Sequence, residues 1–486
     1  MPGLALFTPH KAWRYYKAYL KSEYDAPEVR QQRVWQKLQR LIHHAYENVP
    51  LYKEKWDAAG VKPDDIRSLG DFSRIPVTTK QDLREGFPDR VIARNYASGK
   101  LRYSNTSGTT GRALLMVQDL DDINYKYAAK LRSRKLEGIE VGDRMARTTP
   151  NECRPCLESG LVSEKGFWQY LKSVLAPDGE SAAEYFVFLE SKIIQPVFHG
   201  RMMLPPIGPQ EGDLSDDAWE FYLREISRYK PAIWCTNPLY AYLMAKVVRR
   251  KGLTPPKVKA IDFSGGLVTP KVKRFVSETF GAPAYQSYGG CEFSRYGQEC
   301  GQSGGMMHVL EDHCHVEFIT PSGQPAKPGE LANHIVTSLT NYAEPTIRFE
   351  HGDVGYYKND LCACGRTTRL LDVEGRLQST IITADGKALT EEFFVEKFID
   401  FPGVEWFQLT QRSATEAEML VIQDPSASSG VDVKRLAEEL RVCIGGSVNV
   451  KVVRHIPQEA SGKYMLVKSC SYEHFRCATA AASSRA

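Results

Sequence analysis

The stretch Tyr103-Ser-Asn-Thr-Ser-Gly-Thr-Thr-Gly-Arg112 consists almost wholly of hydroxyl residues and glycine. Its two glycines let the backbone turn tightly, and its serine and threonine hydroxyls suit hydrogen bonds to the oxygens of a polyphosphate. It is not a Walker loop, because the order Gly-x-x-x-x-Gly-Lys-Ser/Thr is missing. Taken alone, such a cluster also fits an ordinary turn, so the rest of the chain has to decide between the two interpretations.

The bulk properties of the 486-residue chain narrow the classes of protein that it fits. A chain of this length divides into two or more domains, and 42% hydrophobic with 25% charged residues is typical of a soluble globular protein. The net charge of +4 gives no basis for nucleic-acid binding. No apolar run approaches the roughly 20 residues that span a bilayer, and the N-terminus lacks the regions of a signal peptide.

Cysteine usage points to a reducing compartment. Eleven cysteines, an odd number, favour reduced thiols with some metal ligation over a disulfide framework. The pair Cys153-Arg-Pro-Cys156 suits a redox or metal role, but no thioredoxin-like βαβ pattern surrounds it, which favours a plain loop. We therefore expect a cytoplasmic protein with no nucleic-acid partner and no membrane partner.

Periodicity predicts helices first and an α/β layered region later. Residues 232–235 and 260–263 have the pattern of buried strands, and residues 271–278 that of the helix between two strands. A helix is also expected through Tyr127 and Leu131, after the hydroxyl-rich loop. Before Pro50, which closes the run, apolar residues recur at helix spacing: Val34, Leu38, Leu41, Ile42 and Ala45.

The pattern changes to β between residues 306 and 375, where residues 314, 316 and 318 form one apolar strand face. The segments 404–409, 417–422 and 448–453, with a helix near 433–442, predict a small α+β domain. We therefore expect an N-terminal domain over 1–376, a small C-terminal domain over 377–470 and a disordered tail over 471–486.

Further short motifs follow the hydroxyl-rich loop in order. They are Ser264-Gly-Gly266 at the end of a predicted strand, Tyr288-Gly-Gly-Cys-Glu292, Arg348-Phe-Glu-His-Gly-Asp353, Gly375-Arg376 and Ser461-Gly-Lys463. Each is weak alone, but in this order they resemble the adenylate-forming superfamily of acyl-CoA synthetases, peptide-synthetase adenylation domains and luciferases. That resemblance implies an α/β fold, with a large multi-layer N-terminal domain of adenylate-forming type and a small mobile α+β C-terminal domain.

The closest resemblance is to the phenylacetate–CoA ligase branch. It is carried by Asn48-Val-Pro-Leu-Tyr52, Gly60-Val-Lys-Pro-Asp-Asp-Ile66, Ile75-Pro-Val-Thr-Thr-Lys80 and Cys362-Ala-Cys-Gly-Arg366, and it runs over about residues 34–468. The segment 135–225 fits poorly. Because that segment would contribute to the acyl pocket, the identity of the substrate is least transferable there.

The resemblance implies an ATP- and Mg²⁺-dependent ligase that activates a carboxylic acid in two steps. The carboxylate first attacks the α-phosphate of ATP, which gives an acyl-adenylate and pyrophosphate. A thiol, usually that of coenzyme A, then displaces AMP. By analogy with the branch, an aromatic or otherwise compact acid is the expected substrate. Trp234 and Tyr240 are candidates to line its pocket, although aromatic residues near strand ends are more often core.

The resemblance also implies the residues of the site. Glu292 would bind Mg²⁺, a hard cation that prefers carboxylate oxygen. Asp353 and Arg376 would reach the ribose, and Lys463, a compact charge on a flexible stem, would bridge carboxylate and phosphate in the first step. The remaining nucleotide-site residues are Thr106, Ser107, Gly108, Thr109, Thr110 and Gly111 around the β- and γ-phosphates, with Gly265, Gly266, Tyr288 and Gly289 bordering the adenine and acyl groups.

Plainer interpretations exist for single members of this set. Asp353 fits a residue that organises a turn, Lys463 an exposed loop lysine, and Glu292 a cap at a helix N-terminus. The ordered set favours the nucleotide site. The chain also departs from the family pattern, since Arg112 replaces a lysine, Cys291 a threonine, and Gln378 the acidic hinge residue. Because domain closure often sets turnover, Gln378 bears on thioester formation more than on adenylation.

A second constellation is Cys300, His308, Cys362 and Cys364. Three thiolates and an imidazole suit a closed, tetrahedral, structural zinc site, and similar residues occur at matching places in some relatives. The Cys-x-Cys spacing is tighter than the usual Cys-x-x-Cys. Ordinary reduced thiols are the alternative interpretation.

Two rival functions remain beside the coenzyme A ligase. One keeps the adenylate and transfers the acyl group to an amine or to the thiol of a carrier protein. The other is a non-catalytic nucleotide-binding or scaffold protein. The presence of Glu292, Asp353, Arg376 and Lys463 together argues against a scaffold, which needs none of them. The sequence identifies neither the acid nor the oligomeric state, and a homodimer stays open.

Overall fold

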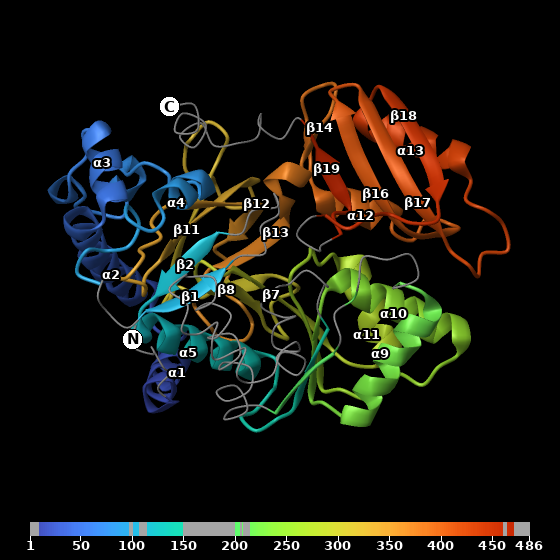
Figure 1. Ribbon diagram of the computed structural model, residues 1–486, viewed down its shortest axis with the longest axis horizontal. Helices are drawn as coiled ribbons and strands as arrows, with labels where there is room; N and C mark the ends of the chain where they lie inside the picture. Colours follow the sequence, from blue (N-terminus) through green and yellow to red (C-terminus); the bar gives the residue numbers. More distant parts are fainter. Residues whose placement is uncertain are drawn as a thin grey trace, which may run out of the picture.

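The computed structural model describes residues 9–96, 101–105, 114–148, 200–204, 207, 214–459 and 464–470. In this part of the chain, an eleven-stranded sheet forms the centre and helices from the N-terminal region pack beside its antiparallel half (Figure 1). A separate four-stranded sheet near the C-terminus lies against helices that connect the parallel strands. The predicted tail, residues 471–486, lies outside the described residues.

The N-terminal region is helical, as predicted. The apolar run at 34–45 is buried on one face of α2, which ends just before Pro50. Pro50 also starts the next helix, since proline at a first helical position loses no hydrogen bond. The elements are α1 (Pro9–Ser22), α2 (Pro27–Asn48), α3 (Pro50–Ala58), α4 (Lys80–Gly86), the hairpin β1 (Arg102–Asn105) and β2 (Leu115–Gln118), and α5 (Leu120–Leu136).

The large sheet is parallel in one half and antiparallel in the other. Its strand order is β10-β11-β12-β13-β9-β8-β7-β6-β5-β3-β4. The parallel strands are β3 (Met145–Arg147), β4 (Arg201–Met203), β5 (Ile233–Thr236), β6 (Ala260–Phe263) and β7 (Ala284–Gly290). The antiparallel strands are β8 (Ser294–Glu299), β9 (Met307–Val309), β10 (Cys314–Ile319), β11 (Ala332–Ser338), β12 (Phe349–Lys358) and β13 (Leu370–Arg376).

Helices α9 (Asp216–Tyr229), α10 (Pro238–Lys251) and α11 (Pro270–Phe280) accompany the parallel strands. The Asn237 side chain accepts a hydrogen bond at the start of α10, and the Thr269 side chain does the same for α11. The predicted strands at 232–235 and 260–263 and the predicted helix at 271–278 are therefore confirmed as β5, β6 and α11. In such a sheet, ligands bind at the carboxyl ends of the parallel strands.

The C-terminal elements form the predicted α+β unit. They are β14 (Ile381–Ile382), β15 (Ala388–Leu389), α12 (Glu391–Phe398), β16 (Val404–Ser413), β17 (Glu416–Gln423), α13 (Val433–Ile444), β18 (Ser447–Val453) and β19 (Val467–Ser469). The sheet has the order β18-β17-β16-β19. The α/β fold class with a small α+β C-terminal unit is confirmed, whereas the boundary at 376/377 stays a prediction.

The small unit shares a hydrophobic core with α9, α10 and α11 in this arrangement. Lys246 on α10 pairs with Glu405 and Asp424 of the small unit, both at 2.8 Å. The Tyr242 hydroxyl donates to the Ile399 carbonyl oxygen at 3.1 Å. These contacts hold the small unit in one orientation against α10.

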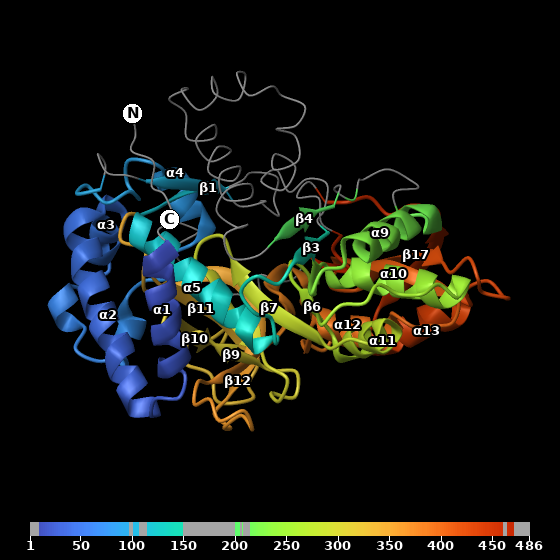
Figure 2. The same ribbon diagram turned by 90° about the horizontal axis from the view of Figure 1, so that it is seen from below.

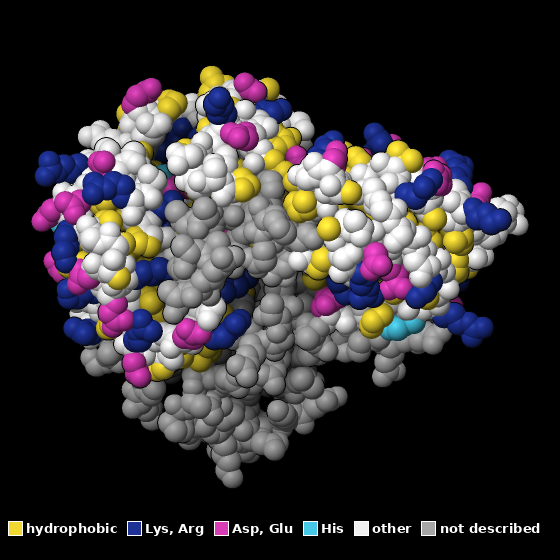
Figure 3. Space-filling view, turned by 90° about the horizontal axis from the view of Figure 1, so that it is seen from above, with side chains coloured by type: hydrophobic (Ala, Val, Ile, Leu, Met, Phe, Trp, Pro, Cys, Tyr) yellow, Lys and Arg dark blue, Asp and Glu magenta, His cyan; other side chains and the backbone are white. Residues whose placement is uncertain are grey.

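Basic and acidic side chains are interspersed over both lobes on the face shown in Figure 3. No helix in the described part of the chain is long and apolar enough to cross a membrane. Trp234 and Tyr240 are buried in the core, where Trp234 packs on Phe280 with ring centroids 5.1 Å apart. They are core residues, as the plainer interpretation of these two aromatics expected.

Candidate active site

The centre of the candidate site is the carboxylate of Asp353. Asp353 on β12 lies directly opposite Arg376 on β13, and its side chain is fully buried. The Tyr288 hydroxyl donates to Asp353 Oδ1 at 2.9 Å, and the Tyr296 hydroxyl donates to Oδ2 at 3.3 Å. Arg376 Nε lies 3.4 Å from Oδ1. Asp353 therefore sits inside a strand among donors, which excludes the interpretation as a turn residue.

His351 links this carboxylate to Glu292. Its Nδ1 contacts Asp353 Oδ2, and its Nε2 lies 3.9 Å from Glu292 Oε2. Glu292 is only 2% exposed and lies in the turn between β7 and β8. It therefore does not cap a helix. The structure brings together four predicted residues from two distant parts of the chain, namely Tyr288, Glu292, Asp353 and Arg376.

The electrostatics keep Asp353 ionised. Burial by itself would raise the pKa of Asp353, but the neighbouring His351 and Arg376 outweigh burial and hold that pKa well below its ordinary value. Burial by itself would lower the pKa of Arg376, but Asp353 holds that pKa above its ordinary value. Burial raises the pKa of Tyr288 well above 10, so its hydroxyl stays a donor. The result is a fixed anion inside a polar cradle.

Steric constraints explain the glycines in the loop after β6 and at the end of β7. Gly265, just beyond the carboxyl end of β6, has a φ of +80°, which glycine adopts without strain. A Cβ at Gly289 would lie 2.0 Å from the Ser294 carbonyl oxygen. A Cβ at Gly266 would lie 2.8 Å from Asn237 Nδ2. At Gly266 and Gly289 the protein itself leaves no room for a side chain, and the predicted place of these glycines beside the adenine and acyl groups stays a prediction.

Three residues near the site received no role from the sequence. Tyr296 and His351 contact Asp353 directly. Lys80 is half-buried at the start of α4. Burial and the charge of Arg376 lower its pKa, and the carboxylates of Glu292 and Asp353 offset this only in part. Its position follows from Thr78, which forms a β-bridge with Phe349 on β12. The Thr78 amide donates to the Arg348 carbonyl oxygen at 2.9 Å. Only the presence of Lys80 in a family motif could have drawn attention to it.

The remaining predicted residues of the nucleotide site lie outside the described residues. They are Thr106, Ser107, Gly108, Thr109, Thr110, Gly111 and Lys463, and the pair Cys153 and Cys156 lies outside them as well. The strands that flank the hydroxyl-rich loop are described. Asn105 on β1 pairs with Leu115 on β2.

Glu344 anchors β2 to the antiparallel half of the sheet. The Val117 amide donates to Glu344 Oε2 at 2.7 Å, and Asn341 Nδ2 donates to the Val117 carbonyl oxygen at 2.9 Å. Glu344 is fully buried, and burial raises its pKa from 4.5 to about 8. A neutral Glu344 thus holds the strand that follows the hydroxyl-rich loop.

This burial predicts a pH dependence of stability. Because the pKa of Glu344 is raised in the folded state, its contribution to stability is fully present below about pH 4.5 and is lost as pH rises through about 8. Glu344→Gln is expected to flatten the fall of the melting temperature between about pH 5 and pH 9 by several degrees. Melting curves of Glu47→Gln, an exposed control, should follow the wild type. Parallel curves for the Glu344→Gln variant and the wild type would contradict this account of Glu344.

The four predicted metal ligands converge. The ligand atoms of Cys300, His308, Cys362 and Cys364 all lie within 4.8 Å of one another. Cys300 Sγ is 3.6 Å from Cys362 Sγ, and Cys364 Sγ is 3.4 Å from His308 Nε2. Tetrahedral zinc with Zn–S bonds of about 2.3 Å places two sulfurs about 3.8 Å apart. The donor set and its spacing therefore fit zinc.

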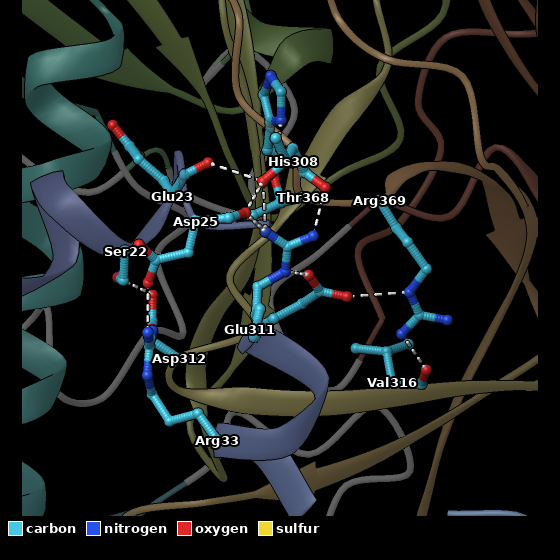
Figure 4. A network of polar contacts seen from close by, with 12 residues as sticks. Ser22, Glu23, Asp25, Arg33, His308, Glu311, Asp312, Val316, Thr368 and Arg369 are labelled. Carbon is cyan, nitrogen blue, oxygen red and sulfur yellow. Dashed lines mark hydrogen bonds and ion pairs between the residues drawn. The ribbon is translucent and has the colours of Figure 1, made fainter. Parts of the chain in front are cut away.

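The surroundings hold this cluster in place. Thr368 Oγ1 lies 2.8 Å from His308 Nδ1 (Figure 4). This contact directs Nε2 toward Cys364. Beside it, Asp312 accepts from Ser22 Oγ at 2.6 Å and Arg369 donates to Glu311 at 3.0 Å (Figure 4). The cluster thus lies where the N-terminal helices meet the β12–β13 connection.

Two of the residues that depart from the family pattern, Cys291 and Gln378, lie close to the candidate site in the sequence. Cys291 is exposed, next to Glu292. Gln378 lies in a single 3-10 turn, Leu377–Ser379, directly after β13. Beside that turn, burial raises the pKa of Glu391 to about 7. The predicted hinge therefore follows Arg376 without a break.

The comparisons with known proteins agree with this picture. No family model matches the chain. The phenylacetate–coenzyme A ligases of Thermus thermophilus and Escherichia coli are each 27% identical over 355 residues, which is 71% of this chain and 70% and 71% of theirs. A solved structure of 2-hydroxyisobutyryl-CoA ligase in its postadenylation state matches with a TM-score of 0.67 at 21% identity, over 94% of this chain and 92% of that chain.

The same enzyme in its thioesterification state matches with a TM-score of 0.53, over 95% of this chain and 92% of that chain. These likenesses, at 21% identity, show the fold, which is that of adenylate-forming coenzyme A ligases. The sequence likeness extends over more than two thirds of the chain and of its relatives. In sequence the chain is therefore similar to the phenylacetate–coenzyme A ligases, and its fold is that of adenylate-forming coenzyme A ligases.

Proposed function

We propose that the chain is an ATP-dependent ligase that activates a small carboxylic acid as an acyl- or aryl-adenylate and passes the acyl group to coenzyme A. One observation carries this proposal. The ionised, fully buried Asp353 is held by Arg376 and two tyrosine hydroxyls beside Glu292, on the fold of adenylate-forming ligases.

Each of the two proposed steps, adenylation and thioester formation, makes one bond and breaks one. A carboxylate oxygen of the acid attacks the α-phosphorus of ATP, the bond between the α-phosphorus and the bridging oxygen breaks, and pyrophosphate leaves. The sulfur of coenzyme A then attacks the acyl carbon, and the bond from that carbon to the phosphate oxygen breaks, which releases AMP. Such chemistry needs positioning and charge neutralisation more than covalent help from the protein.

Asp353 and Arg376 would bind the ribose hydroxyls. The carboxylate has four contacts, and two of them are long, at 3.3 Å to the Tyr296 hydroxyl and 3.4 Å to Arg376 Nε. A carboxylate offers about four lone-pair sites. A ribose hydroxyl would therefore replace a weak contact rather than a strong one, and the short bond from Tyr288 would persist.

Glu292 would hold Mg²⁺. Among the described residues, its carboxylate accepts no hydrogen bond, and His351 Nε2 lies 3.9 Å from Glu292 Oε2. A hard cation prefers such an oxygen ligand. When bound, Mg²⁺ would neutralise charge on the transferring phosphates. The donor type and the free carboxylate thus fit the ion.

The other roles come from the resemblance and stay predictions. The loop 106–111 would hold the β- and γ-phosphates, and Lys463 would bridge the acid and the α-phosphate. The residues bordering the adenine and acyl groups would be Gly265, Gly266, Tyr288 and Gly289. A carrier-protein partner, an aromatic substrate, a homodimer and a cytoplasmic location also stay predictions.

The small unit over 377–470 would act as the mobile lid. The chain as a whole matches the postadenylation state of the solved ligase with a TM-score of 0.67 and its thioesterification state with 0.53, which supports a small unit in the postadenylation orientation. Rotation between such states would break the Lys246–Glu405 and Lys246–Asp424 pairs. Gln378, at the predicted hinge, lies in the turn through which this rotation would pass.

A structural zinc ion would bind Cys300, His308, Cys362 and Cys364, and the convergence of their ligand atoms supports this proposal. Replacing Cys364 with serine is expected to release about one zinc per chain and to lower the melting temperature by several degrees, because three ligands hold zinc poorly. Elemental analysis with thermal melting measures both. Cys443→Ser, on α13, is the matched control and should retain the metal. A wild-type protein without zinc would end the zinc proposal.

The acceptor is tested by product analysis. Purified protein is incubated with ATP, Mg²⁺ and a panel of aryl and short aliphatic acids, with and without coenzyme A. The products are identified by mass spectrometry. An acyl-CoA with release of AMP supports the proposal. An adenylate without a thioester would redirect the function to an amine or carrier-protein acceptor. Absence of both ATP binding and adenylate would favour a scaffold.

A further inference from the structure

A cluster of charged side chains lies in the parallel half of the large sheet and has no part in the chemistry described so far. Arg147 on β3, Cys235 on β5 and Asp262 on β6 are neighbours in one row of the parallel sheet. Their side chains therefore share one face of the sheet. Arg134 on α5 reaches the same row, since its Nη1 donates to Asp262 Oδ2 at 2.9 Å and its Nη2 lies 3.3 Å from Cys235 Sγ.

The cluster carries more positive than negative charge. Asp262 also pairs with Arg295 Nη2 at 2.7 Å, and Glu137 pairs with Arg134 at 2.6 Å. Three guanidinium groups, those of Arg134, Arg147 and Arg295, thus face two carboxylates. Even with both carboxylates ionised, one positive charge is in excess.

Arg147 carries this excess. Within the part of the chain that the structure describes, its guanidinium forms no hydrogen bond and no ion pair, although the residue is partly buried. Its backbone carbonyl accepts from the Leu204 amide at 3.0 Å. Guanidinium stays charged in proteins, and a charge in a partly buried position is costly unless it is paired. An unpaired arginine at the carboxyl end of a parallel strand, where ligands bind, therefore points to an anion that arrives with the substrate.

Helix α5 connects the cluster to the turn that carries Glu292. At one end of this stretch of α5, Lys126 Nζ donates to the Glu292 carbonyl oxygen at 3.3 Å. Arg134 follows eight residues later on the same helix, which lies along the sheet (Figure 2) and rises about 1.5 Å per residue. The cluster therefore lies about 12 Å along α5 from the turn that carries Glu292. Asp262 also precedes the Gly265 loop by three residues.

We propose that Arg147 binds a second anionic group at the far end of the acyl chain, so that the preferred substrate is a dicarboxylic acid. This inference rests on the proposed adenylation function. Among the described residues, Arg134 and Arg295 pair with Asp262 and Glu137, whereas the guanidinium of Arg147 has no such partner and is available to a ligand. One carboxylate of the acid reacts at the nucleotide, and the other pairs with Arg147 and neutralises the excess charge.

The test compares matched acids in ATP–pyrophosphate exchange on the whole protein. The pairs are phenylacetate with 4-carboxyphenylacetate, and hexanoate with adipate. The wild type is expected to favour the diacid of a pair at least about 10-fold in kcat/KM. Arg147→Met is expected to raise the KM for that diacid about 10- to 100-fold, the range for a lost charge-assisted hydrogen bond. Its kcat and its use of the monoacid should change little.

Two further variants separate binding from folding. Arg147→Lys should restore part of the diacid affinity, because it restores the charge but not the fork of two donors. Arg144→Met removes an exposed arginine just before the same strand and should leave both acids unaffected. The melting temperature of Arg147→Met should equal that of the wild type, since no ion pair is lost. A large fall would show a structural role and overturn the inference.

The remaining outcomes are distinct. Exchange that depends on monoacids alone, or an Arg147→Met variant with the same acid preference as the wild type, overturns the role of Arg147 and leaves the proposed function intact. Exchange with none of the acids, together with failure to bind ATP, overturns the proposed function and this inference with it.

Discussion

Replacing Asp353 with asparagine is expected to lower ATP–pyrophosphate exchange by about 100-fold or more, the scale for losing a positioned charge in a preorganised site. The change keeps the shape of the side chain but removes its charge. Tyr288 and Tyr296 would then face an amide, and Arg376 would lose its buried counterion. Much of the loss should appear as a higher KM for ATP, because the ribose contact is made before and during reaction.

The variant should also be less stable. Removing one partner of a fully buried pair costs about 3–5 kcal/mol; because the Arg376 side chain is 22% exposed, we expect a smaller loss here. Asp372→Asn is the matched control, since Asp372 lies on the neighbouring strand β13 and accepts from the Tyr356 hydroxyl at 3.3 Å, away from the site. Exchange is measured at a temperature at which all three proteins are folded. Unchanged exchange in Asp353→Asn would remove Asp353 from the nucleotide site.

Replacing Lys463 with alanine is expected to abolish adenylation, with exchange reduced about 1000-fold, while ATP still binds. The physical reason is that a single ammonium group would neutralise the acid carboxylate and the α-phosphate as charge develops between them. Thioester formation from a supplied acyl-adenylate should be affected far less, because the bond to the α-phosphate already exists at that stage.

A second lysine provides the control for that experiment. Lys468 on β19 lies five residues further along the same domain. Lys468→Ala should retain exchange, since it removes a surface charge of similar size. Equal exchange in the wild type and the Lys463→Ala protein would refute the role of Lys463, provided that circular dichroism shows both folded.

The local pattern of the sequence was enough for most elements. Strand β6 and helix α11 were predictable because buried apolar runs and helix periodicity are local signals, reinforced by the Thr269 cap. The convergence of Tyr288, Glu292, Asp353 and Arg376 was predictable only through the order of family motifs. Spacing by itself gave no distance between residues that are about 60 to 90 positions apart.

The contacts that complete the site could not be predicted, because they depend on strand register. His351 reaches Glu292, and Tyr296 reaches Asp353, only once β12 and β8 are placed in the same sheet. Likewise, Arg147 is an ordinary arginine in the sequence. Its importance follows from its row in the sheet beside Cys235 and from the pairing of every neighbouring guanidinium with a carboxylate.

The central claim is that this chain makes an acyl-adenylate. Carboxylate-dependent ATP–pyrophosphate exchange by the purified wild-type protein, with Mg²⁺ and a panel of mono- and dicarboxylic acids, tests it most directly. The account predicts incorporation of labelled pyrophosphate into ATP only when a suitable acid is present, and its loss in Asp353→Asn. A protein that binds ATP but exchanges no pyrophosphate with any acid, or one that exchanges equally without an acid, would contradict it.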